Sequence, residues 1–149
     1  MKWLVLIHVM SAIIGVGPTY FGHVFFRKGQ TVGDLKHSLR FGRLMEFFPK
    51  IGGTIAVLSG LLLLVLTDWK FLSFWIVASI VLYVAIQVVV IAIVSPVTKR
   101  LFQWVQATAQ SDQESLPAEQ SSMLNKANYW YYAASTMGTL IFILMILKP

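Results

Sequence analysis

The stretch "KWLVLIHVMSAIIGVGPTYFGHVFF" (residues 2–26) decides the fold of this chain. Its apolar run from Trp3 to Phe26 is longer than the roughly 20 residues that a helix needs to cross the hydrocarbon layer of a membrane. A signal peptide would have a shorter apolar core and a small-residue cleavage site, and "FGHVFFRK" (residues 21–28) offers no such site. We therefore expect a retained membrane-spanning helix.

The composition of the whole chain agrees with this expectation. Of its 149 residues, 57% are hydrophobic and 12% are charged, and the mean hydropathy is +0.73. Soluble domains are about 25% charged, so we expect one integral membrane domain over residues 1–149, with the lipid bilayer as its partner. The chain has no cysteine, which excludes disulfides and thiolate metal sites. Its pI of about 9.8 does not indicate nucleic acid, because the basic residues lie between apolar spans.

The chain contains four apolar stretches long enough to cross a membrane. They cover about residues 3–26, 47–66, 71–94 and 129–147. Backbone polar groups in lipid must be hydrogen-bonded within the segment, which only helices of this length achieve. The predicted fold class is all-α, a four-helix transmembrane bundle.

The three connections between the spans differ in character. Residues 27–43 are basic, and residues 67–70 ("TDWK") predict a tight turn. Residues 98–128 are polar; their first part either continues the third helix or lies at the membrane interface. Around Pro117 we expect a flexible loop, because proline breaks a helix.

The distribution of lysine and arginine predicts the orientation of the chain. Eight of them lie in the first and third connections: Arg27, Lys28, Lys36, Arg40, Arg43, Lys99, Arg100 and Lys126. Three lie on the opposite side: Lys2, Lys70 and Lys148. The more basic side stays in the cytoplasm, so we expect both termini to be extracytoplasmic, in a bacterial cytoplasmic membrane.

The first span carries its polar and small residues on one stripe. At 100° per residue they fall within about 120° of one another; they are His8, Ser11, Ala12, Gly15, Thr19, Gly22 and His23. Small residues allow close helix approach, and polar ones hydrogen-bond between helices. The stripe is therefore expected to face the bundle, with Pro18 kinking the helix.

Two interpretations of His8 remain open. It is either a ligand or proton carrier, because intramembrane ionisable groups usually mark sites, or a neutral imidazole hydrogen-bonded to a neighbouring helix. His23 has the same alternatives, with the structural one favoured by its position near Arg27. The two histidines are about 22 Å apart along a helix and cannot share one metal ion. At the depth of His8 the other helices offer no second histidine, only Ser59, Gly60, Lys70, Trp75, Ser79 and Met145.

A second polar cluster opens the second span. Glu46 and Lys50 are four residues apart, so they can pair on one helix face, and Arg43 is three residues from Glu46. The cluster is either a structural ion pair or a site for an anionic group. No nucleotide-binding loop, paired carboxylates or nucleophile with a base is present, so the sequence leaves enzymatic activity open.

Three segments resemble one family of membrane proteins. They are "LIHVMSAIIGVG" (residues 6–17), "FWIVASIVLYVAIQVVVIAIVSPVTKRL" (74–101) and "MILKP" (145–149). Together they resemble the bacterial integral membrane proteins grouped as domain of unknown function 2269. This resemblance covers nearly the whole chain and implies four membrane helices, without an established activity.

A more distant resemblance concerns His8 and the segment "RL…P…GT…SGLLLL", which begins at Arg43. These residues are similar to the HemJ-type protoporphyrinogen oxidases and the copper-resistance D-type membrane proteins. The resemblance implies that His8 and a lysine near the third helix bind haem b. Lys70 matches that lysine, although another alignment places Ser73 there.

The leading functional hypothesis is therefore a haem-linked or redox role, with His8 as axial ligand. Arg27, Arg43 and Lys50 could pair with haem propionates, but they lie at the membrane face opposite His8. Lys2 and Lys70 are the better propionate partners. Alternative hypotheses are transport or channel activity for an ion or small solute by a homo-oligomer, and a structural or assembly role without a ligand.

Overall fold

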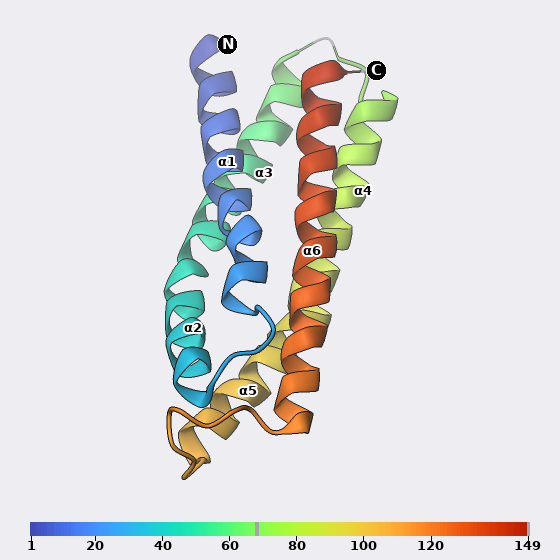
Figure 1. The fold of residues 1–149 in the computed structure, drawn as a ribbon. Coiled ribbons are helices and arrows are strands. Elements are labelled where there is room, and N and C mark those ends of the chain that lie inside the picture. Colours follow the sequence, from blue (N-terminus) through green and yellow to red (C-terminus); the bar gives the residue numbers. More distant parts are fainter. Residues whose placement is uncertain (68, 149) are drawn as a thin grey trace.

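The computed structural model of the chain describes residues 1–67 and 69–148. The predicted turn at residues 67–70 lies partly outside these residues, and so does Pro149. In the described part the regular secondary structure is helical, apart from one isolated bridge between Thr31 and Ser115. There are four long helical rods, and each runs antiparallel to the one before it in the chain (Figure 1). The predicted all-α four-helix bundle is thereby confirmed.

The helices join into these four rods in chain order. Their bounds are α1 Lys2–Phe25; α2 Val32–Met45 followed by α3 Phe47–Leu66; α4 Phe74–Val88, a π-helical segment η1 Val89–Val94 and α5 Ser95–Ala107; and α6 Ala118–Leu147. Each rod is long and apolar enough to cross a membrane. The third rod includes α5, so the polar residues after the third span continue its helix.

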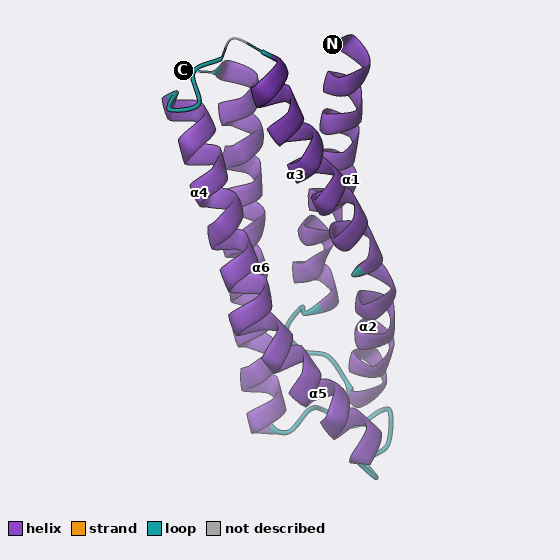
Figure 2. Cartoon of the chain, turned by 180° about the vertical axis from the view of Figure 1, so that it is seen from behind, coloured by secondary structure: helices purple, strands orange, loops and turns teal. Residues whose placement is uncertain are grey.

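The rods pack as two pairs, which contact each other through α1 and α6 and through α2 and α5. Helix α1 packs along α3, α4 packs along α6, and α1 also packs against α6. Figures 1 and 2 show α1 and α3 on one side of the molecule and α4 and α6 on the other. Both termini lie at one end of the bundle, and α2 and α5 lie at the opposite end (Figure 1).

Helix α2 occupies most of the connection that the sequence analysis treated as a basic loop. Its N-terminus has a capping box: the Thr31 hydroxyl accepts from Asp34 N at 3.2 Å, and the Asp34 carboxylate accepts from Thr31 N at 3.3 Å. Val32, Leu35 and Leu39 are buried on one face. These apolar residues recur at helical spacing among charged ones, so a count of the charges alone does not reveal the helix.

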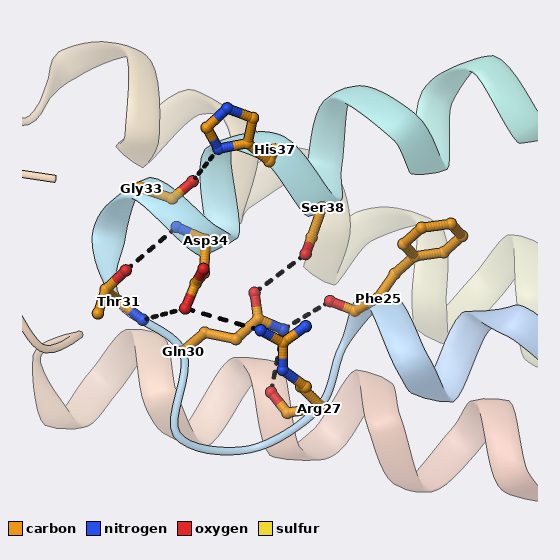
Figure 3. A network of polar contacts seen from close by, with 8 residues as sticks. All are labelled: Phe25, Arg27, Gln30, Thr31, Gly33, Asp34, His37 and Ser38. Atoms are coloured by element: carbon orange, nitrogen blue, oxygen red, sulfur yellow. Dashed lines mark hydrogen bonds and ion pairs between the residues drawn. The ribbon is translucent and has the colours of Figure 1, made fainter. Parts of the chain in front are cut away.

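The turn between α1 and α2 is closed by Gln30, which is buried (Figure 3). Its amide nitrogen donates to the carbonyl oxygens of Phe25 at 2.6 Å and Arg27 at 3.0 Å. Its amide oxygen accepts from the Ser38 hydroxyl at 3.1 Å. These bonds satisfy the free carbonyl groups at the end of α1 and fix the direction in which α2 leaves.

The loop between α5 and α6 is tied to the start of α2. Val32 N donates to the Glu114 carbonyl oxygen and Gly33 N to that of Asp112, each at 2.9 Å. The Asp112 carboxylate also pairs with Lys36 at 2.6 Å. The loop expected to be flexible thus has specific backbone partners. The loop was expected to continue past Pro117, but it ends there: α6 begins at Ala118, before the predicted fourth span.

The large buried side chains gather at the α2 and α5 end. One core cluster there consists of Phe26, Leu35, Leu39, Leu101, Leu124 and Ala127. Along the apolar rods, by contrast, most large hydrophobic side chains are exposed, as expected for surfaces that face lipid. The buried residues of α1 are the small Ser11, Gly15 and Gly22.

Candidate intramembrane imidazole site

Helices α1 and α3 touch through their glycines. A Cβ atom built on Gly15 would lie 2.6 Å from Gly53 N, and one built on Gly52 would lie 2.6 Å from Gly15 N. The two backbones are therefore in direct contact, which a larger residue at either position would prevent. This contact confirms the predicted close-packing role of the small-residue stripe, and it places the polar residues of α1 against α3.

His8 lies two turns above this crossing and faces α3. Its Nδ1 lies 2.9 Å from the Ala56 carbonyl oxygen and 3.2 Å from the Ser59 hydroxyl oxygen. The Ser59 hydroxyl itself donates to the Ile55 carbonyl oxygen at 2.6 Å. The ring is half-buried, and it faces protein, as the sequence predicts.

These contacts select one protonation form of His8. A carbonyl oxygen can only accept a hydrogen bond, so Nδ1 must carry the proton. The Ser59 oxygen, whose proton goes to Ile55, is a second acceptor for the same N–H. A second proton on Nε2 would make a cation inside the membrane, which is costly. In the neutral form of this ring the lone pair is therefore on Nε2, and this is the form in which histidine binds metals.

Gly60 leaves room for the His8 ring against α3. A Cβ atom at this position would lie 2.9 Å from Cε1 and 3.8 Å from Nε2 of His8. The missing side chain thus leaves space for the imidazole, and Nε2 makes no hydrogen bond within the described residues. Of the partners that the sequence offers at this depth, the structure brings Ser59 and Gly60 to His8.

Lys70 lies in the loop before α4 and is exposed. Its carbonyl oxygen accepts from Ser73 N at 2.9 Å and from the Ser73 hydroxyl at 2.7 Å, so both residues take part in the turn that starts α4. Hydrogen bonds within the described residues do not link Lys70 or Ser73 to His8. Helix α4 packs on α6 rather than on α1.

A different lysine holds the aromatic residues at this end. Lys148 Nζ lies 4.2 Å from the ring centroid of Trp69 and 5.6 Å from that of Trp75. The two indole rings pack edge to face at 5.3 Å. These contacts pin the end of α6 to the start of α4 through cation–π attraction. Sequence analysis missed them because the three residues are far apart along the chain.

The other two histidines are not part of the His8 site. The His23 ring stacks on Tyr132 at 4.6 Å, and Asn128 Nδ2 donates to the His23 carbonyl oxygen at 2.8 Å. His37 is exposed, and its Nδ1 lies 2.8 Å from the Gly33 carbonyl oxygen of its own helix. In residues 1–67 and 69–148 no group of three or more histidine, aspartate or glutamate side chains could hold a metal ion.

Three cations at the end opposite His8 were possible partners of haem propionates, and two of them already pair with carboxylates. Arg27 lies 3.8 Å from Asp34, and Lys50 pairs with Glu46 at 3.1 Å. The Glu46–Lys50 pair confirms the structural interpretation of that spacing. Arg43 instead stacks over Phe102.

Sequence analysis also missed the hydroxyl contacts between neighbouring rods. Tyr20 on α1 and Thr139 on α6 share a hydrogen bond of 2.8 Å, and the Ser135 hydroxyl donates to the Thr19 carbonyl oxygen at 3.1 Å. The Tyr83 hydroxyl on α4 lies 3.6 Å from where a Cβ of Gly53 would be. Tyrosine was counted as an apolar residue, so these polar contacts carried no sequence signal.

The fold and these contacts define a small all-α membrane protein. A family model described as "Predicted integral membrane protein (DUF2269)" matches residues 2–149, and the chain belongs to this family. A search of curated proteins and a search of solved structures found no match. The resemblance to this family is thereby confirmed, and the chain is in contact with the lipid bilayer.

Proposed function

We propose that this membrane protein binds haem b through Nε2 of His8 and has a redox or haem-linked role. The observation that carries the proposal is the hydrogen bond of 2.9 Å from His8 Nδ1 to the Ala56 carbonyl oxygen. Histidines that bind metals usually donate their other ring N–H to a carbonyl or carboxylate, which fixes the ring and its tautomer. His8 has this arrangement.

The surroundings of His8 support a ligand role as well. The ring lies against one face of α3, where the Ala56 carbonyl and the Ser59 hydroxyl contact Nδ1 and Gly60 leaves space for it. A bound haem would supply a one-electron redox centre at this position. Ala56 and Ser59 would keep the proton on Nδ1, so Nε2 stays free to ligate.

Lys2 and Lys70 are the proposed partners of the haem propionates, and Lys70 is also the proposed second ligand. Lys2 begins α1, six residues before His8, so its charge lies about 9 Å from the histidine along the helix axis. Lys70 follows α3 at the same end of the bundle. The proposed membrane is the bacterial cytoplasmic membrane, with this end facing outward.

The absorption spectrum of protein purified from cells supplied with haem tests the proposal. We expect a Soret band in the wild type and its loss in His8→Ala. His23→Ala is the matched control, since His23 lies on the same helix and should leave the band unchanged. A colourless wild type, or a band that survives His8→Ala, would contradict the proposal.

A ligand role can be separated from a folding defect by chemical rescue. In His8→Gly, added imidazole should restore the Soret band, because the free ring can occupy the space beside Gly60 and ligate in place of the side chain. If the variant is monodisperse and helical but imidazole restores nothing, His8 stabilises the bundle without ligating haem.

A second candidate is transport of an ion or small solute by a homo-oligomer. It is favoured by the Tyr83 hydroxyl and the Gln87 amide, one helical turn apart on α4 and without hydrogen bonds in the described part of the chain. Uptake of Zn²⁺ into liposomes, reduced in Tyr83→Phe and Gln87→Leu, would support transport. Colourless protein in liposomes without flux would instead favour the assembly role.

A further inference from the structure

A cavity of about 380 Å³ opens between α2 and α5, at the end of the bundle opposite His8. It is lined by Arg40, Arg43, Leu44 and Phe102. Its volume falls in the range of roughly 300–1,000 Å³ that is usual for sites that bind small molecules. Two arginines and two apolar side chains thus line one hollow, whose surface is mainly apolar.

The two arginines of this cavity have no carboxylate partner among the described residues, unlike several other cations at this end of the bundle. Near them, three cations have carboxylate partners: Arg27 with Asp34, Lys36 with Asp112, and Lys50 with Glu46. Within residues 1–67 and 69–148, neither Arg40 nor Arg43 has such a partner. The Arg43 Cζ atom lies 5.3 Å from the centroid of the Phe102 ring, which holds its guanidinium against α5.

The cavity lies at the level where the apolar part of the second rod begins. Arg43 is one helical turn before Phe47, the first residue of α3. Leu44 and Phe47 are 65% and 62% exposed, as expected for side chains in contact with lipid. We therefore expect the arginines to lie at the depth of the lipid phosphates, with the apolar Leu44 and Phe102 beside them. A soluble anion would gain nothing from the apolar side chains of Leu44 and Phe102.

We propose that the cavity binds an anionic phospholipid, with its phosphate on Arg40 and Arg43. Arginine donates two parallel hydrogen bonds to phosphate oxygens, and the exposed guanidinium groups have those donors available. Leu44 and Phe102 pack against the glycerol and the first carbons of the acyl chains. Basic pockets at the membrane boundary of helical proteins bind such headgroups. This site is independent of His8 and of any haem.

Thermal unfolding of the purified protein in a neutral detergent tests the site. A ligand that binds the folded state raises Tm by an amount that grows with the logarithm of its concentration relative to Kd. We expect phosphatidylglycerol to bind at least tenfold more tightly than phosphatidylcholine with the same acyl chains. Inorganic phosphate should leave Tm unchanged at the same concentration. An equal shift with inorganic phosphate would overturn the proposal of a lipid ligand.

Charge-removing variants then locate the binding. Arg40→Gln with Arg43→Gln should weaken phosphatidylglycerol binding at least tenfold. The matched control is Lys28→Gln with Lys126→Gln, which removes two exposed charges at the same end but outside the cavity; it should change binding less than twofold. Equal losses in both double variants would show general attraction to anionic lipid and overturn the assignment.

A third double variant guards against a folding defect. Arg40→Lys with Arg43→Lys keeps both charges but removes the forked donors, so binding should fall between the wild type and the glutamine variant. Native mass spectrometry of co-purified lipid gives the same ranking without relying on Tm. Wild-type levels of bound phosphatidylglycerol in the glutamine variant would exclude the site.

Discussion

The Nδ1 atom of His8 on α1 lies 2.9 Å from the carbonyl oxygen of Ala56 on α3. One side chain thus both joins two membrane helices and fixes the proton on one of its own nitrogens. The two roles use different atoms of the ring, because Nδ1 makes the contact and Nε2 remains free. Substitutions that preserve one atom and remove the other can therefore separate them.

Asparagine at position 8 should retain the contact with α3 and lose the free ring nitrogen. The amide nitrogen of asparagine and Nδ1 of histidine are both three bonds from Cα, so His8→Asn can still donate to Ala56. We expect stability within about 0.5 kcal/mol of the wild type for His8→Asn. His8→Leu should lose about 1–2 kcal/mol, the upper range of hydrogen bonds between membrane helices. Unfolding in detergent measures both, and equal losses would contradict the contact.

Alanine at Gly52 should weaken the α1–α3 pair far more than alanine at Gly53. A Cβ on Gly52 would lie 2.6 Å from Gly15 N, whereas one on Gly53 meets only the Tyr83 hydroxyl, at 3.6 Å. Gly52→Ala must therefore push two backbones apart, at a loss of about 1–3 kcal/mol. Gly53→Ala should stay within about 0.5 kcal/mol. If unfolding midpoints of the two variants coincide, the helices do not cross here.

The start of α2 should depend on its buried leucine rather than on its ion pair. Leu35 is fully buried, so Leu35→Ala should reduce the free energy of unfolding by about 2–5 kcal/mol. Its neighbour Lys36 pairs with Asp112 at 2.6 Å, but both side chains are exposed to water, and Lys36→Ala should lose under about 1 kcal/mol. Chemical denaturation followed by circular dichroism distinguishes the two. A larger loss in Lys36→Ala would contradict this ranking.

The proposed orientation can be measured by labelling single cysteines, because the chain has none of its own. Leu72, 84% exposed, lies at the end with both termini, and Ser111 lies in the loop at the α2 and α5 end. An impermeant maleimide should label Leu72→Cys in intact bacterial cells and Ser111→Cys only after lysis. The reverse pattern would place the termini in the cytoplasm.

The sequence predicts the spans and the inward stripe of α1 because both follow from local patterns. Apolar length identifies a membrane helix, and the 100° step places His8, Ser11 and Gly15 on one face. The Ala56 carbonyl and the Lys148 amine could not be predicted as partners, since both depend on which helices become neighbours. Helix α2 was predictable from the spacing of Val32, Leu35 and Leu39, but its charges were interpreted only as a topology signal.

The pairing of α1 with α3 also has a consequence for biosynthesis. The residues described as hydrogen-bonding to the imidazole or leaving room for it are Ala56, Ser59 and Gly60, and they belong to the second rod, which ends at Leu66. We expect the ring to be oriented as soon as this hairpin has entered the bilayer, while the remaining half of the chain is still being translated. Helix α6 then packs against the other side of α1, which is already paired with α3.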